Sequence, residues 1–257
     1  MTRPLAAGTI ALLMAFPLLA APQETGSAEL NPNRVILSLL PSMPTGGGYL
    51  TTRAATRELE RAACVSGGRL IVSPSLASPS YCSGATYIVF LRALEMMTGG
   101  SPFSGVLANA LAVRDQPDGN GVWGRWNANG PGTACLFREL QLGPSFASFD
   151  AAQPGDFMKI FWTSEVGRRE RGHSVIFLGL ERQNGVEMVR FWSSNKPTGF
   201  GQKSVPRSKI ANAIFSRLEY PANIERAPML SQRDPYLAGL LTQDSSFSEA
   251  LARAGAR

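Results

Sequence analysis

The sequence predicts an α+β fold in which helices come first and an antiparallel sheet follows. Apolar residues recur with helical spacing from Cys82 to the terminator Thr98-Gly99-Gly100. The second half instead carries runs of strand length, and two of them flank Asn184-Gly185, a strong hairpin signal. We therefore expect a helix that begins at Cys82 to pack on a C-terminal antiparallel sheet.

The length and composition are those of one main globular domain with appendages. The chain has 257 residues, of which 44% are hydrophobic and 17% charged. Residues 1–20 are interpreted as a secretory signal, because Arg3 precedes an apolar run from Leu5 to Ala21 that is broken by Pro17. The run is short for a membrane span. We therefore favour export, to the periplasm or the medium, over an uncleaved membrane anchor, and expect no stable membrane insertion.

The main domain is expected to span residues 49–220. Residues 21–48 are rich in Pro, Gly, Ser and Thr, and are expected to form a linker or lead-in. The patterns predict helices over 51–64, 106–113 and 134–142 beside the one that begins at Cys82, and a short strand over 70–72. Residues 118–132 are rich in glycine and hold two tryptophans, so we expect a long loop there.

Strands dominate the second half of the predicted domain. Apolar or alternating runs predict strands over 157–162, 174–180 and 186–192. A last helix is predicted over 208–218. Residues 221–257 are expected to form a polar, irregular C-terminal tail, with a weakly amphipathic end over 247–254.

The charge balance is basic. The formal net charge is +6, and removal of Arg3 with the signal leaves +5 (+6 − 1). A basic protein attracts anionic partners, such as a bacterial wall or a membrane surface. The chain has no arginine-aromatic stripe or nucleic-acid motif, so we expect no nucleic-acid partner.

Two residues stand out as candidates for catalysis. Cys82 falls in the first turn of its predicted helix, where free backbone N–H groups and the helix dipole favour a thiolate over a thiol. His173 is the only histidine, and it directly precedes a predicted strand. Imidazole is the group whose pKa suits the removal of a thiol proton near neutral pH. We therefore interpret Cys82 as the nucleophile and His173 as its base.

A polar residue that orients the imidazole is expected on the strand after the hairpin. A two-residue turn would place His173 opposite Lys196, whereas a three-residue loop would place it opposite Asn195. We favour Asn195, whose side-chain oxygen can accept from the ring N–H. Ser194 and Ser193 are the alternatives.

The chain has three cysteines, so at least one thiol is unpaired. In an oxidising compartment a Cys64–Cys135 bridge would leave Cys82 free, whereas a Cys64–Cys82 bridge would abolish its reactivity. The sequence does not decide between the two. One histidine and three scattered cysteines offer no ligand cluster, so we expect neither a metal nor another cofactor.

Three motifs stand in order along the chain: Tyr81-Cys82-Ser83-Gly84, Pro154-Gly155-Asp156-Phe157 and Gly172-His173-Ser174-Val175-Ile176-Phe177-Leu178-Gly179. Together they resemble the NlpC-type and CHAP-type cell-wall hydrolases of the papain-like superfamily, over about residues 74–200. The resemblance implies a papain-like fold with Cys82 as nucleophile, His173 as base and Asn195 as the third polar residue. The chain departs from the family in the long segment between Cys82 and His173, and in Tyr81, where an acidic or amide residue is common.

The resemblance also implies a function and a substrate. It predicts an exported cysteine peptidase or amidase that cleaves amide bonds in the peptide stems of peptidoglycan. Ser83, Trp123, Trp126 and Asn127 are the expected substrate-binding residues, although packing is an alternative role for the indoles. The alternative functions are a non-catalytic wall-binding module of the same fold and an acyltransferase that uses the same triad.

Overall fold

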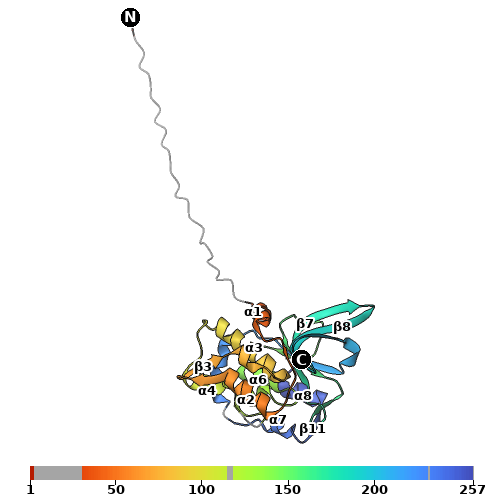
Figure 1. The fold of residues 1–257 in the computed structure, drawn as a ribbon. Coiled ribbons are helices and arrows are strands. Elements are labelled where there is room, and N and C mark those ends of the chain that lie inside the picture. The colour runs from red at the N-terminus through yellow and green to blue at the C-terminus, as the bar shows by residue number, and fades with distance from the viewer. Residues whose placement is uncertain (3–30, 115–117, 231, 257) are drawn as a thin grey trace.

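Helix α3 and a seven-stranded antiparallel sheet form the centre of the fold (Figure 1). The computed structural model describes residues 1–2, 31–114, 118–230 and 232–256. Apart from residues 1 and 2, the expected signal over 1–20 lies outside these ranges. Within the described ranges, no helix is long and apolar enough to cross a membrane. The large sheet and its helices confirm the predicted α+β class.

The elements have the following bounds. The α-helices are α1 (Pro32–Leu39), α2 (Arg53–Ala62), α3 (Cys82–Met97), α4 (Gly105–Leu111), α5 (Gly121–Trp126), α6 (Gly132–Leu140), α7 (Pro235–Gly239) and α8 (Phe247–Ala254). Short 3₁₀-helices cover Leu40–Ser42, Pro74–Ala77, Arg207–Lys209 and Pro221–Met229. The strands are β1 (Gly46–Gly47), β2 (Ala63–Ser66), β3 (Arg69–Val72), β4 (Ser145–Phe146), β5 (Phe157–Phe161), β6 (Glu165–Gly167), β7 (His173–Gln183), β8 (Val186–Asn195), β9 (Gly199–Pro206), β10 (Asn212–Ser216) and β11 (Asp244–Ser246). The large sheet has the order β1-β9-β8-β7-β5-β10-β4, while β2 pairs with β3 and β6 with β11.

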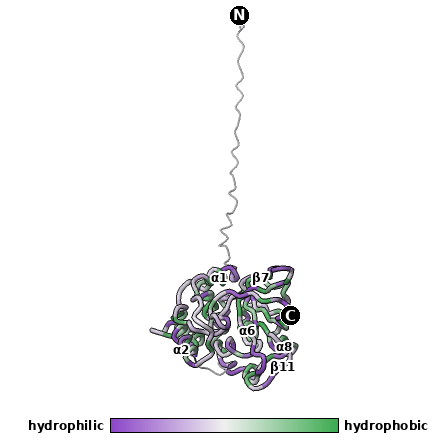
Figure 2. Tube along the Cα trace, turned by 45° about the vertical axis from the view of Figure 1, so that its right-hand side comes forward, coloured by the Kyte–Doolittle hydropathy of each residue, from purple (hydrophilic) through white to green (hydrophobic). Residues whose placement is uncertain are grey.

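The sheet separates two apolar cores, because successive side chains of a strand point to opposite faces. Phe157 and Ile176 belong to the larger core, which includes α3 and the other central helices. Met158 and Val175 belong to a smaller core, against which Phe149 packs. Figure 2 shows the hydrophobic stretches gathered in the body of the molecule. The alternation along β5 and β7 therefore buries both faces of the sheet.

Helix α3 is buried on nearly all sides, as an apolar helix at the centre of a domain must be. Residues Ile88–Leu91 have no exposed surface. The ring of Phe90 stacks on Trp126 with centroids 4.5 Å apart, and it meets Phe157 of β5 edge-on at 5.8 Å. These contacts fix α3 against the sheet.

A two-residue turn joins β7 to β8 at Asn184-Gly185, the position of the predicted hairpin. Asn184 and Gly185 both have positive φ angles, of 48° and 80°, which are the angles that a type I′ turn requires. Gln183 pairs with Val186 directly beside the turn. The hairpin thus has the shorter of the two loops considered from the sequence.

The register of the hairpin nevertheless changes before the start of β7. Between Phe177 and Gly179 the pairing shifts by one residue, since β7 carries an extra residue in a β-bulge. Continued to the start of β7, the shifted register places His173 opposite Asn195 rather than Lys196. The predicted partner is therefore correct, but the bulge and not a three-residue loop produces it.

Most elements predicted within residues 51–192 are confirmed to within a few residues, but the segment before them differs. Residues 32–47, expected to lie in a linker, form α1 and β1. The Asn31 side chain caps α1 by accepting from a backbone N–H of the first turn. Ile36 and Leu39 are buried in the core with α3, and β1 pairs with β9. Five apolar residues in a polar lead-in were too few to predict this helix.

The helix predicted over 208–218 is wrong, because the segment forms strand β10 between β5 and β4. Ile214 and Phe215 are buried on opposite faces of the sheet, in two different cores. Such alternation has the period of a strand. A short run that is apolar on both faces cannot be distinguished from a helix by its spacing alone.

The residues after 220 also differ from the expected irregular tail. A 3₁₀-helix, α7, β11 and α8 follow one another, and β11 pairs with β6. Ile224 of the 3₁₀-helix and Leu237 of α7 have no exposed surface. Ala250 and Ala254 of α8 pack with Phe161 of β5. This part of the chain is therefore integrated in the fold.

Asp156, from the Pro-Gly-Asp motif, joins three parts of the fold from a fully buried position. Its carboxylate accepts from Asn33 Nδ2 of α1 at 2.9 Å and from the backbone N–H of Gln153 at 2.8 Å. Arg217, which follows β10, adds a bidentate pair at 2.9 and 2.7 Å. A buried carboxylate depends on such partners for its stability. The motif thus has a structural role here.

Replacement of Arg217 tests that role. We expect Arg217→Met to lower the free energy of unfolding by about 3 kcal/mol, because the Asp156 carboxylate stays buried without its cation. Urea unfolding followed by circular dichroism measures the change. The matched control is Arg190→Met, which removes an exposed pair with Glu181 and should cost less than about 1 kcal/mol. Equal losses in both variants would contradict the assignment.

Candidate active site

Cys82 is the first residue of α3 and is 8% exposed, at a cleft of about 280 Å³. Tyr81 precedes it as the N-cap, without a capping hydrogen bond from its side chain. The backbone N–H groups of the first helical turn therefore have no side-chain cap, and the positive end of the helix dipole lies at the sulfur. Both features favour a negative charge at this position.

His173 begins β7, and its ring is held by Asn195 at the end of β8. The ring Nε2 lies 3.2 Å from Asn195 Oδ1. The Asn195 amide nitrogen donates to the carbonyl oxygens of Ser193 and Gly201, at 3.1 and 2.9 Å, so the amide oxygen is the atom that faces the ring. Because that oxygen can only accept, we assign the proton to Nε2, which leaves Nδ1 free to accept from the Cys82 thiol.

The two serines considered as alternatives to Asn195 have other partners. Ser194 Oγ donates to the carbonyl oxygen of Ser80 at 2.9 Å, just before α3. Ser193 Oγ donates to the carbonyl oxygen of Ser174 at 2.7 Å. Both hydroxyls fasten backbone segments around the cleft, and Asn195 is the one that contacts the imidazole.

The neighbours of Cys82 lower the pKa of its thiol by more than burial raises it. Burial alone would raise the pKa of Cys82, but the charge of His173 and its hydrogen bond to the sulfur lower it, with further contributions from Lys159 and the backbone N–H of Ser174. The resulting pKa is about 6. A thiol with this pKa is mostly thiolate at neutral pH, the form that acts as a nucleophile.

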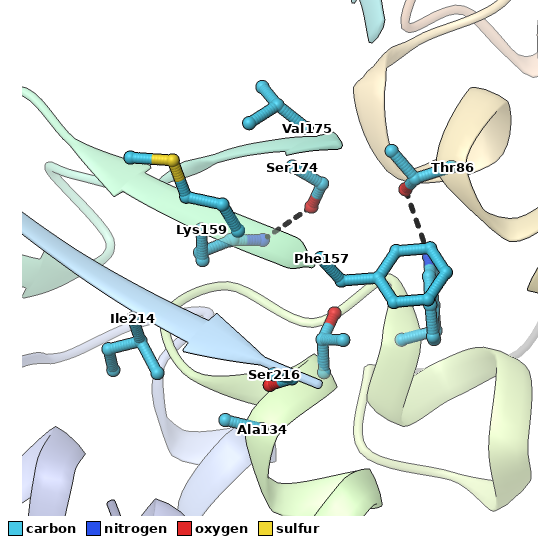
Figure 3. A pocket seen from close by; sticks show the side chains of 11 residues that line it. Thr86, Ala134, Phe157, Lys159, Ser174, Val175, Ile214 and Ser216 are labelled. Carbon is cyan, nitrogen blue, oxygen red and sulfur yellow. Dashed lines mark hydrogen bonds between the residues drawn. The ribbon is translucent and has the colours of Figure 1, made fainter. Parts of the chain in front are cut away.

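Lys159 is a site residue that the sequence patterns did not identify. It lies on β5, two residues after Phe157 and hence on the helix side of the sheet, and is 6% exposed. Its Nζ donates to Ala128 O and to Ser174 Oγ, both at 3.2 Å. Figure 3 shows the bond to Ser174. Lys159 also lines a cavity of about 10 Å³, which has room for about one water molecule. Figure 3 shows the side chains that line this cavity. The available signal was a lysine in the middle of an apolar strand.

The pKa of Lys159 depends on its burial and on the negative charges around it. Burial lowers the pKa of its ammonium, whereas the negative charges of Cys82, Asp118 and Glu170 raise it. Gly172 makes room for this lysine: it has a φ of 79°, and a Cβ there would lie 2.6 Å from Lys159 Cε. A buried cation beside the thiolate reduces the cost of burying either charge alone.

Tyr49 is a second residue that was not anticipated. Its hydroxyl lies 3.9 Å from Cys82 Sγ, on the side of the cleft formed by the segment between β1 and α2. Burial, followed by the charge of Cys82, raises the pKa of Tyr49, so the phenol stays protonated. A protonated phenol here can donate to an anion that forms at the sulfur or at a carbonyl attacked by it.

Two of the four expected substrate-binding residues line the cleft. Ser83 and Asn127 both lie there, and Ser83 Oγ donates to Asn127 Oδ1 at 2.7 Å. Their side chains meet across the gap between α3 and the end of α5. No described residue hydrogen-bonds to the amide nitrogen of Asn127, which can therefore donate to a carbonyl or carboxylate of a bound molecule.

Trp123 and Trp126 do not form a cleft wall, contrary to expectation. The loop expected over 118–132 contains α5, which turns both indoles into the core, where they are 2% and 1% exposed. Trp126 Nε1 donates to the carbonyl oxygen of Ser83 and to Thr86 Oγ1, at 3.1 and 3.2 Å. The indoles thus hold α5 against the first turns of α3, so their effect on the cleft is indirect.

None of the three cysteines is in a disulfide, so neither bridge considered from the sequence is formed. Cys64 lies half-buried on β2, and Cys135 is buried in α6, where burial raises the pKa of its thiol to about 12. Cys82 is therefore the thiol set apart by its low pKa. Across the ranges that the structure describes, no three His, Cys, Asp or Glu side chains are grouped to hold a metal ion.

The arrangement places a thiol that can act as a nucleophile beside an imidazole that can act as its base and an amide that orients the imidazole, the groups that attack on a carbonyl carbon requires. We expect iodoacetamide to alkylate Cys82 at a rate that rises as pH increases through about 6, where the thiol loses its proton. His173→Ala should move this midpoint upward towards an ordinary thiol pKa, and Lys159→Met should move it upward by a smaller amount. Mass spectrometry of the Cys82 peptide gives the rate.

Lys209→Met is the control for that measurement. Lys209 is exposed in the 3₁₀-helix Arg207–Lys209 and lies outside the cleft, so its removal should leave the midpoint unchanged. An unchanged midpoint in His173→Ala would contradict the pairing of the imidazole with the thiol.

Comparison of the chain with models of protein families, with curated proteins and with solved structures finds no match. The site itself therefore carries the functional argument. It consists of a low-pKa thiol at a helix N-terminus, an imidazole with an assigned tautomer, and an amide that holds the imidazole in place.

Proposed function

We propose that the protein is a cysteine amidohydrolase or peptidase with Cys82 as nucleophile, His173 as general base and acid, and Asn195 as the orienting residue. The single observation that carries the proposal is the hydrogen bond of His173 Nε2 to the fixed oxygen of Asn195, because it directs Nδ1 to a thiol with a pKa of about 6. A structural histidine would not need this alignment. The relation of nucleophile helix, sheet and histidine strand supports a papain-like, NlpC-type fold.

The reaction follows from the positions of these groups. The Cys82 thiolate attacks an amide carbonyl carbon, and the oxygen becomes an anion near the free N–H groups of α3 and the Tyr49 hydroxyl. His173, protonated by the thiol proton, gives that proton to the leaving amine as the C–N bond breaks. Water then attacks the thioester, with His173 accepting its proton, and the thiolate is restored as the carboxylic acid leaves.

The proposed substrate is the peptide stem of peptidoglycan. Support comes from the predicted signal over residues 1–20, which implies export to the periplasm or the medium, and from the basic charge, +5 without the signal (+6 − 1), which suits an anionic polymer. The cleft offers Asn127, Arg171 and Asp118 as polar groups for a peptide backbone and its charged ends. No cofactor takes part in the proposed reaction.

The test is digestion of isolated peptidoglycan sacculi with the purified protein. Wild-type protein should release fragments with new free amines, detected by amine labelling and mass spectrometry. Cys82→Ala and His173→Ala should abolish release, and Asn195→Ala should slow it by roughly 100-fold, because the imidazole loses its orienting bond. Cys64→Ala, which changes a thiol outside the cleft, should leave the rate unchanged.

Either of two other results would contradict the proposal. Binding of sacculi without any release, together with an unreactive Cys82, would indicate a non-catalytic wall-binding module. Transfer of an acyl group to an added amine in preference to water would indicate an acyltransferase with the same triad.

A further inference from the structure

A second hollow opens on the imidazole side of the site. It has a volume of about 300 Å³ and is lined by Trp162, His173, Lys196 and Lys203, among others. It shares only two lining residues, Tyr49 and Gly172, with the cleft of about 280 Å³ in which Cys82 lies. The reactive pair therefore stands between two separate hollows.

The second hollow is cationic. Lys196 and Lys203 are exposed in its wall, and its lining of described residues holds no aspartate or glutamate. Every ion pair among the described residues uses an arginine, so neither ammonium is neutralised within that part of the chain. Lys203 Nζ donates to the carbonyl oxygen of Lys196 at 3.4 Å, and Lys196 Nζ lies 5.4 Å from the centre of the Tyr49 ring.

Glu170, two residues before Gly172 in the wall of this hollow, already has hydrogen-bond partners. Glu170 is buried, and its carboxylate accepts from the backbone N–H groups of Trp162 and Gly172 at 3.0 and 2.9 Å. Its role is to hold the segment that forms the wall. By contrast, the Cys82 cleft contains Asp118 beside Lys159 and Arg171, so its charges are mixed.

The chemistry of the proposed reaction assigns each hollow to one part of the substrate. The acyl group becomes bonded to Cys82 Sγ, so it lies in the cleft of Cys82. The leaving amine receives its proton from His173, so it must lie beside the imidazole. The cationic hollow is lined by His173, so it can receive the part of the substrate that carries the leaving amine.

We propose that this hollow binds a carboxylate carried by the leaving amine, with Lys196 and Lys203 as the specificity-determining residues. The inference rests on the proposed function and narrows its substrate class to amides whose amine part is an amino acid or a peptide with a carboxylate close to the scissile bond. Trp162 is 40% exposed, and its ring stacks on that of His173 with centroids 6.3 Å apart. Its indole offers an apolar surface for the remaining atoms of the amine part of the substrate. Amides whose amine part is ammonia or a neutral alkylamine lack this carboxylate, so we expect them to be cleaved more slowly.

The test compares one substrate with and without its carboxylates. Soluble muropeptides are prepared from sacculi, and half of the material is amidated with carbodiimide and ammonium. Wild-type protein should cleave the unmodified muropeptides about fivefold to tenfold faster, as kcat/KM at low salt, because two exposed charge contacts are lost on amidation. The double variant Lys196→Gln/Lys203→Gln should reduce this preference to less than about twofold.

The matched control is Lys209→Gln, which removes an exposed lysine from outside both hollows and should keep the full preference. Equal cleavage of the two preparations by wild-type protein would overturn the inference and leave the proposed function intact. If neither preparation is cleaved, the proposed function fails instead. Titration of the preparations into Cys82→Ala then decides the inference separately: tighter binding of the unmodified muropeptides, lost in the double lysine variant, supports it, and equal binding overturns it.

Discussion

The aromatic packing between α3 and the sheet is the interaction on which the candidate site depends. Phe90 stacks on Trp126 and meets Phe157 edge-on, so the helix cannot shift along the sheet without breaking these contacts. Cys82 lies at the first turn of this buried helix, and His173 at the first residue of a sheet strand. Because both reactive groups belong to rigid elements, their relative position is set by the core and not by a mobile loop.

Local patterns predicted much of this arrangement. The start of α3, the position of the hairpin at Asn184-Gly185 and the strands that lead to His173 and Asn195 could all be read from spacing and turn residues. The β-bulge could not be predicted, because it depends on how β7 pairs with β8. A glycine with a φ of 128° at position 179 is compatible with it but does not specify it.

Side-chain direction marks the limit of sequence analysis in the site. Two tryptophans in a glycine-rich stretch look alike whether they face solvent or core, and only the packing of α5 on α3 shows that both are buried. Lys159 is the opposite case. A lysine is rarely placed on the core side of a central strand without a purpose, since burial of its charge is costly. Lys159 lies beside Ser174 and lowers the pKa of the Cys82 thiol. This contact joins residues far apart in the sequence, so the sequence pattern alone could not show it.

The bulge at Leu178 divides the β7–β8 hairpin into two parts with different constraints. On the side towards His173, a change in length by a single residue turns the imidazole away from Asn195. On the side towards Asn184, the pairing of β8 with β9 ends at Met188, so paired insertions or deletions between Met188 and the turn and in the facing part of β7 change only the reach of the hairpin. The projecting end of the hairpin, labelled β7 and β8 in Figure 1, can therefore differ in length and charge without a change in the alignment of His173 with Asn195.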